Sequence, residues 1–158
     1  MHAGLVEEEE LFRAVQRSGT RALLIGRRAL IMLGLPVATF DYDFWIHIDD
    51  AERLNQALEP LGLVPNRSPE EARRFGRYVL ENDTRVDVMV ARVVPTVDGQ
   101  RVAWEDVWER RVSLEAVPGI PVAIPCVDDL IATKRFGARA KDANDIQLLQ
   151  VLQKRGTS

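Results

Sequence analysis

The sequence of 158 residues has little of several features that would point to particular classes of protein. It has one cysteine, Cys126, which excludes an internal disulfide and a cysteine-based metal site. No apolar run is long enough to cross a bilayer, so we expect no membrane span. The formal net charge is only −3, which argues against broad nonspecific binding of nucleic acid.

The chain also lacks repeats, low-complexity tracts and linkers rich in Gly, Ser or Pro. With 46% apolar residues it can bury one substantial core and is short for two. Residues 1–13 are acidic, whereas a secretory signal is basic and then apolar. We therefore expect a single domain over residues 1–158, located in the cytoplasm.

Two aspartates stand in an otherwise strand-like segment, residues 39–48. Side chains alternate between the faces of a strand, so Asp41 and Asp43 share one face. The other face is apolar and holds Phe40, Tyr42, Phe44, Ile46 and Ile48. A strand disfavours Asp, so the pair indicates a task that outweighs propensity, and holding Mg²⁺ or Mn²⁺ fits that task. The plainer interpretation is a polar strand face that meets solvent.

Two neighbouring segments favour the metal-binding interpretation. Residues 22–26 form an apolar run that ends at Gly26, and residues 27–34 form one or two helical turns. Such a strand, turn and helix can present backbone N–H groups to phosphate. In residues 85–90 valines alternate with other residues, and Asp87 lies on the face opposite the valines. Three carboxylates beside this turn would make a two-metal site for phosphoryl or nucleotidyl transfer from a triphosphate.

The remaining pattern predicts helices and strands around these segments. We expect helices over residues 6–17, 49–61, 104–110, 127–136 and 141–153, and a short helix from the capping box at Ser68. We expect a strand over residues 75–80 and an extended segment over residues 112–124. The predicted fold class is α/β (α+β), with a mixed, mainly antiparallel sheet flanked by helices and a C-terminal helical part at about 127–153.

The order of these parts resembles the nucleotidyltransferase superfamily, specifically small bacterial members related to abortive-infection and toxin–antitoxin nucleotidyltransferases. The resemblance runs from residue 22 to 149 and includes Asp-Leu-Ile-Ala-x-Lys at 129–134 and Arg-x-Lys-Asp-x-x-Asp at 139–145. It implies that Lys134 holds the triphosphate, although a lysine on such a helix is as often a surface residue. It also implies that Asp142 and Asp145 orient Lys134 or Arg139, whereas both also suit helix capping, which is the favoured interpretation for Asp142.

Two positions depart from the family pattern. Arg27 stands where a small residue usually follows the glycine, and Val37 stands where an arginine usually follows Pro36. A long side chain at position 27 would either block the triphosphate or supply a cation to its phosphates. The second outcome is favoured, because an arginine at a helix N-terminus is electrostatically unfavourable unless an anion sits there.

The combined prediction is a Mg²⁺- or Mn²⁺-dependent transfer of a nucleotidyl group from a nucleoside triphosphate to a hydroxyl of an RNA end, a protein or a small molecule. The expected metal ligands are Asp41, Asp43 and Asp87, with Asp87 also accepting the hydroxyl proton. The expected nucleotide site consists of Gly26, Arg27, Lys134 and Asp142. The resemblance adds a cognate toxin or antitoxin as a partner. The alternative is a catalytically silent protein that acts through nucleotide or protein binding.

Overall fold

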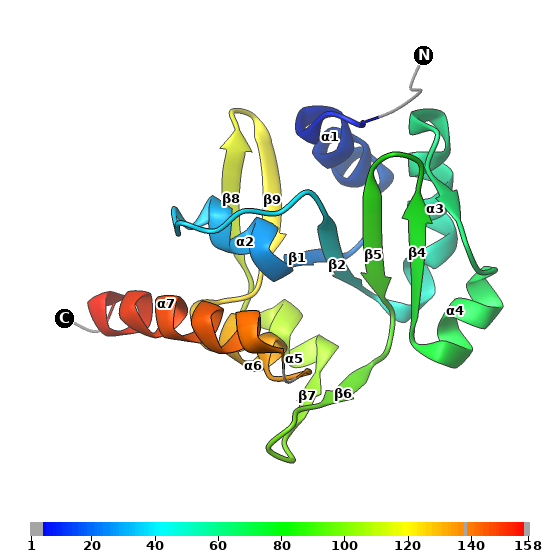
Figure 1. The fold of residues 1–158 in the computed structure, drawn as a ribbon. Helices are drawn as coiled ribbons and strands as arrows, with labels where there is room; N and C mark the ends of the chain where they lie inside the picture. Colours follow the sequence, from blue (N-terminus) through cyan, green and yellow to red (C-terminus); the bar gives the residue numbers. More distant parts are fainter. Residues whose placement is uncertain (1–4, 138, 157–158) are drawn as a thin grey trace.

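The computed structural model describes residues 5–137 and 139–156, and a five-stranded sheet forms its centre (Figure 1). The strands lie in the order β1 (Ala22–Ile25), β2 (Tyr42–Ile46), β5 (Arg85–Met89), β4 (Arg77–Glu81) and β3 (Val64–Pro65). β2 and β5 are parallel, whereas the other neighbouring pairs are antiparallel. The predicted mixed, mainly antiparallel sheet is therefore confirmed.

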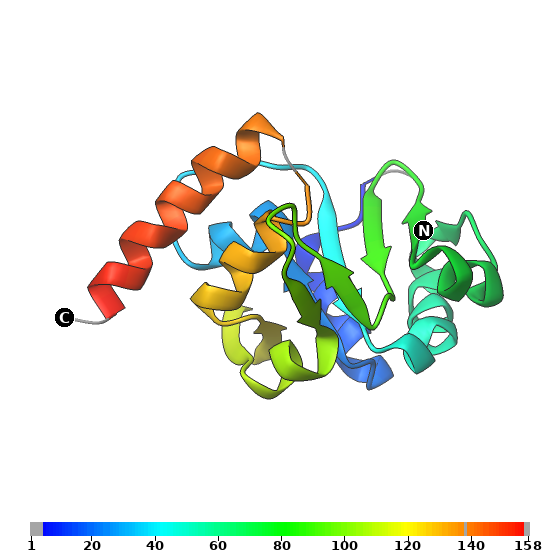
Figure 2. The ribbon, with the colours of Figure 1, turned by 90° about the horizontal axis from the view of Figure 1, so that it is seen from below.

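Helices and two hairpins surround this sheet. The helices are α1 (Glu8–Ser18), α2 (Gly26–Met32), α3 (Ala51–Leu58), α4 (Pro69–Phe75), α5 (Trp104–Glu109), α6 (Val127–Lys134) and α7 (Ala140–Gly156). The hairpins are β6 (Val93–Pro95) with β7 (Arg101–Ala103), and β8 (Val112–Val117) with β9 (Ile120–Ile124). In the described part of the chain, no helix is both long and apolar enough to cross a membrane. Helix α7 packs chiefly on α6, and its C-terminal half extends away from the sheet (Figure 2).

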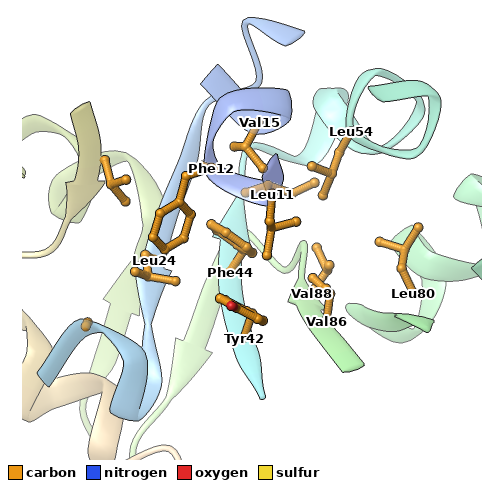
Figure 3. Close-up of a cluster of buried hydrophobic side chains, with 14 of the residues drawn as sticks. Leu11, Phe12, Val15, Leu24, Tyr42, Phe44, Leu54, Leu80, Val86 and Val88 are labelled. Atoms are coloured by element: carbon orange, nitrogen blue, oxygen red, sulfur yellow. The ribbon is translucent and has the colours of Figure 1, made fainter. Parts of the chain in front are cut away.

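One face of the sheet is buried under α1 and α3. Figure 3 shows Phe12 of α1 directed toward Leu24 and Phe44 of the sheet, with Leu54 of α3 and Val88 of β5 beside them. These side chains are at most 2% exposed. Strand alternation explains the arrangement, because residues two apart point to the same face.

A second, smaller core covers part of the opposite face. Trp45 of β2 packs with Leu23, Trp104 and Val107. The indole N–H of Trp104 donates to the carbonyl of Trp45, and the indole N–H of Trp45 donates to the carbonyl of Ala91. Both buried indoles therefore have hydrogen-bond partners. The part of this face that the second core leaves open carries Asp43 and Asp87.

Two predicted aromatic positions are wrong. Phe40 was placed on the inward face of a strand, yet β2 begins at Tyr42 and Phe40 is 89% exposed. The backbone bends at residue 40, and the N–H of Asp41 donates to the Thr39 hydroxyl. Phe75 was expected to begin a strand but ends α4. The confirmed capping box at Ser68 starts that helix, and Gly76, with φ +81°, ends it.

Candidate functional site

The open part of the sheet face forms a cavity of about 710 Å³. Strands β2, β4 and β5 form its floor, and α2, α6 and the start of α7 stand at one end. The structure brings all the residues of the predicted site to this one cavity: Gly26, Arg27, Asp41, Asp43, Asp87, Lys134 and Asp142. Their roles in binding and catalysis stay predictions, and the geometry defines what each side chain can do.

Two of the three predicted metal ligands are direct neighbours. Because β2 and β5 are parallel and in register, Asp43 lies opposite Asp87. Asp41 precedes β2 and is exposed. Burial, together with the negative charges of Asp87 and Asp41, raises the pKa of Asp43 to about 6. A cation placed among these carboxylates would offset their mutual repulsion and favour the ionised form of Asp43.

Asp87 already has a cationic partner. Arg85 donates two hydrogen bonds to it, from Nε to Oδ2 and from Nη2 to Oδ1, both at 3.1 Å. Within residues 5–137 and 139–156, no group of three or more His, Cys, Asp or Glu side chains is arranged to hold a metal ion. The oxygen donors suit Mg²⁺ or Mn²⁺ chemically. Binding at Asp87 would require Arg85 to move.

Gly26 allows the turn between β1 and α2 to pass against Asp43. Its φ is +69°, a conformation that L side chains rarely adopt. A Cβ atom at this position would lie 2.4 Å from Oδ2 of Asp43, which is well inside van der Waals contact. The glycine predicted from sequence is therefore required by both backbone conformation and space, and it leaves the backbone beside Asp43 open to a ligand.

Replacing Gly26 by alanine is expected to lower the free energy of unfolding by roughly 1–3 kcal/mol and to displace the Asp43 carboxylate. Gly34→Ala is a matched control, because Gly34 has φ +83° but an added Cβ would meet nothing within 4 Å. Urea unfolding should show a larger loss for Gly26→Ala than for Gly34→Ala. Equal losses would contradict the close approach to Asp43.

A buried ionic cluster forms the other end of the cavity. Asp145 is fully buried and lies 2.8 Å from Nζ of Lys134. It also accepts hydrogen bonds from Nε and Nη2 of Arg27, both at 3.2 Å. Burial alone would raise the pKa of Asp145, but the hydrogen bonds from Lys134 and Arg27 outweigh burial and lower it. One carboxylate thus holds two cations.

Lys134 is not the surface residue that one interpretation of the sequence favoured. Its side chain is 5% exposed, and Nζ also lies 3.7 Å from Oδ1 of Asp142. Arg139 donates to Asp142 through Nε, 3.1 Å from Oδ2, and through Nη2. Asp142 therefore joins Lys134 to Arg139, as the resemblance implied. The resemblance gave Asp145 the same orienting role, and its contact with Lys134 agrees; its spacing from Asp142 puts both on one face of a helix.

Arg27 points neither to open solvent nor into empty space. Its side chain is 24% exposed and spans from α2 to Asp145 on α7. It also lines the cavity. The ion pair to Asp145 resolves the electrostatic objection to an arginine at the start of a helix, because a protein carboxylate supplies the anion.

Sequence reasoning missed several residues that also line the cavity. Phe75, Arg77 and Arg85 come from the end of α4 and from β4 and β5. Arg85 could have been found, because its spacing from Asp87 places both side chains on one face of a strand. Arg77 could not, because its place depends on the register of β4 against β5.

Comparison with known proteins identifies the fold. No family model and no curated protein matches the chain. Two structures of the antibiotic-resistance factor ANT(2'')-Ia, one with adenylyl-2''-tobramycin, share 15% identity at a TM-score of 0.61, covering 92% of this chain and 81% and 86% of theirs. The lincomycin-bound lincosamide antibiotic adenylyltransferase LnuA shares 15% identity at 0.62, covering 92% of this chain and 97% of its own. A Thermotoga maritima protein provisionally described as a nucleotidyltransferase shares 12% identity at a TM-score of 0.59. The match covers 99% of this chain and 98% of that protein. The chain therefore has the nucleotidyltransferase fold.

Proposed function

We propose that the protein transfers a nucleotidyl group from a nucleoside triphosphate to a hydroxyl of an acceptor. The observation that carries this proposal is the pairing of Asp43 and Asp87 on parallel strands, in the same cavity as the buried Lys134. Two proteins of the same fold support it. ANT(2'')-Ia was solved with an adenylyl-tobramycin, and LnuA is named an adenylyltransferase.

The carboxylates Asp41, Asp43 and Asp87 would hold Mg²⁺ or Mn²⁺. A bound divalent ion supplies positive charge at the reacting phosphate and lowers the pKa of the attacking hydroxyl. For Asp87 to take part, Arg85 would exchange its contact with Asp87 for solvent or for substrate. The half-exposed position of the Arg85 side chain leaves it room to do so.

In the reaction, the acceptor oxygen forms a bond to the α-phosphorus of the triphosphate. The bond from that phosphorus to the bridging oxygen breaks, and pyrophosphate leaves with the electron pair. Asp87 accepts the hydroxyl proton. The backbone at Gly26, with Lys134 and Arg27, would bind the phosphates, and Asp142 would hold Lys134 in place. A fixed ammonium group there stabilises the charge that develops on pyrophosphate.

Incubation with each α-labelled nucleoside triphosphate, Mg²⁺ or Mn²⁺, and cell lysate tests the proposal. We expect label transfer with at least one nucleotide, and a rise in Tm when the triphosphate and metal bind. The double variant Asp41→Asn/Asp43→Asn should lose both. Asp83→Asn, an exposed aspartate in the turn after β4, is the matched control and should keep both. No transfer and no Tm shift with any nucleotide would refute the proposal.

The alternative, a silent protein that binds nucleotide or a protein partner, is favoured by one observation. Arg85 pairs with Asp87 and Arg27 pairs with Asp145, so two groups of the site have partners within the chain itself. A nucleotide-dependent rise in Tm without label transfer would establish this alternative. A cognate toxin or antitoxin and a cytoplasmic location stay predictions from the sequence.

A further inference from the structure

The end of the cavity opposite α6 and α7 has a composition of its own. Helix α4 and strand β4 lie on the far side of β2 and β5 from α6 and α7, in both views (Figures 1 and 2). We call the residues gathered there the arginine–aromatic wall: Arg67, Arg74, Phe75 and Arg77. Phe75 and Arg77 line the cavity, on either side of Gly76. The β1–α2 turn and the ionic cluster, proposed above for the triphosphate, lie at the other end.

Phe75 is a large apolar side chain held at the surface beside the cavity. It is 55% exposed. The guanidinium carbons of Arg67 and Arg74 lie 4.4 and 5.1 Å from the centre of its ring. Nη1 of Arg67 also donates to the carbonyl of Arg77 at 2.7 Å, which fixes Arg67 against β4. The ring is therefore held beside cationic neighbours while more than half of its surface stays exposed.

Arg77 shares a sheet face with the catalytic carboxylates proposed above. In the β4–β5 register Arg77 lies opposite Met89, and Val79 lies opposite Asp87. Arg77 is thus one strand across and two residues along from Asp87, a diagonal separation of about 7–8 Å. It makes no ion pair with any residue that the structure describes. A cation without a partner at this distance suits an anionic group next to the reacting hydroxyl.

The positive charge on this wall disfavours a polycationic acceptor at this end of the cavity. Tobramycin, present as its adenylyl product in one ANT(2'')-Ia structure, carries several amino groups that are cationic at neutral pH. Three arginines on the wall would repel such a molecule. The nearby carboxylate of Glu71 accepts a hydrogen bond from the N–H of Ser68 and caps α4. The wall therefore favours an acceptor that has a planar ring and a negative charge.

We propose that the arginine–aromatic wall binds the acceptor, and that the acceptor is a nucleotide unit with its base on Phe75 and its phosphate on Arg77. This proposal rests on the proposed function. A ribose hydroxyl oxygen of this unit bonds to the α-phosphorus of the triphosphate, pyrophosphate leaves, and the proton passes to Asp87. The product is a phosphodiester between two nucleotides. A free mononucleotide and the 3′ end of an RNA strand present the same chemistry.

Direct binding measurements with three probes test this assignment. The probes are a nucleoside monophosphate, a short single-stranded RNA with a free 3′ hydroxyl, and tobramycin. The proteins are the wild type, Phe75→Ala, Arg77→Gln and the control Arg101→Gln, which changes an exposed arginine of β7 outside the cavity. We expect a nucleotide probe to bind the wild type and the control equally, and each wall variant about tenfold or more weakly. Arg77→Gln should also reduce the salt dependence of binding.

The rise in Tm with triphosphate and Mn²⁺ is measured in parallel, and it reports on the proposed function separately. The wall variants should keep that rise. Comparable affinity for both nucleotide probes would identify a free nucleotide as acceptor, and tighter binding of the RNA would identify a strand end. Equal affinity of wild type and wall variants, stronger binding of tobramycin, or loss of the Tm rise in the wall variants would overturn the inference. If the wild type shows neither label transfer nor a rise in Tm but still binds a nucleotide probe, the proposed function is refuted.

Discussion

Replacing Asp145 by alanine is expected to lower the free energy of unfolding by about 3–5 kcal/mol, because the change leaves cations without their buried partner. Asp145 is fully buried and holds Lys134 at 2.8 Å and Arg27 at 3.2 Å. Lys134 would keep only Asp142, at 3.7 Å. Urea unfolding at neutral pH measures the loss.

A double-mutant cycle separates the ionic effect from a general loss of packing. Lys134→Met removes the buried ammonium group but keeps an apolar side chain of similar length. In the Asp145→Ala background this second change should restore part of the stability, because it removes the uncompensated charge. Two results would contradict the role assigned to the cluster. One is a loss of unfolding free energy below about 1 kcal/mol for Asp145→Ala. The other is a loss in the double variant that exceeds the sum of the losses in the two single variants.

Asp43→Asn is expected to reduce the proposed nucleotidyl transfer strongly while stabilising the fold. The folded protein raises the pKa of Asp43 from its ordinary 3.8 to about 6, chiefly through burial. The folded state thus binds this proton more tightly than the unfolded state. Stability from this group is fully present below pH 4 and is lost as the pH rises through about 6, a total of roughly 2–3 kcal/mol. Asparagine avoids that loss, so the variant should be more stable than wild type at pH 7.

Urea unfolding from pH 4 to pH 8 tests the sign. The difference between Asp43→Asn and wild type should grow over pH 4–6 and then level off, whereas Asp83→Asn should follow the wild type. Nucleotidyl transfer by Asp43→Asn should fall by roughly 10²–10³-fold or more, because charge stabilisation at the reacting phosphate is lost. Parallel pH profiles for Asp43→Asn and wild type would contradict the raised pKa of Asp43.

The side of the sheet on which the carboxylates lie was predictable, because strand alternation assigns a face without knowledge of the fold. Asp43 and Asp87 were placed on the open face in this way, and the structure pairs them in register. Alternation gave a wrong position for Phe40, because it does not predict where a strand begins, and β2 begins at Tyr42. It also could not assign Phe75, where the helix capped at Ser68 continues to Gly76.

The partner of Arg27 and the burial of Lys134 could not be predicted from sequence, whereas the resemblance implied that Asp142 and Asp145 contact Lys134 or Arg139. Lys134 is buried because Asp145 approaches it from α7, and the packing of α7 on α6 is a tertiary fact. Arg27 binds the same carboxylate, although the two residues are 118 positions apart in the chain. An arginine or lysine can extend in many directions, so its partner depends on elements that local patterns do not place together.

The parallel pairing of β2 with β5 obliges the chain to make a long excursion before Asp87 can return beside Asp43. That excursion contains α3, β3, α4 and β4, and it supplies every residue of the arginine–aromatic wall. Asp43 and Asp87 stand just outside its two ends. The residues proposed to bind the acceptor therefore come from one continuous stretch of chain, and the paired aspartates proposed for the reaction lie outside it. Substitutions within this stretch can change the proposed wall while Asp43 and Asp87 keep their register.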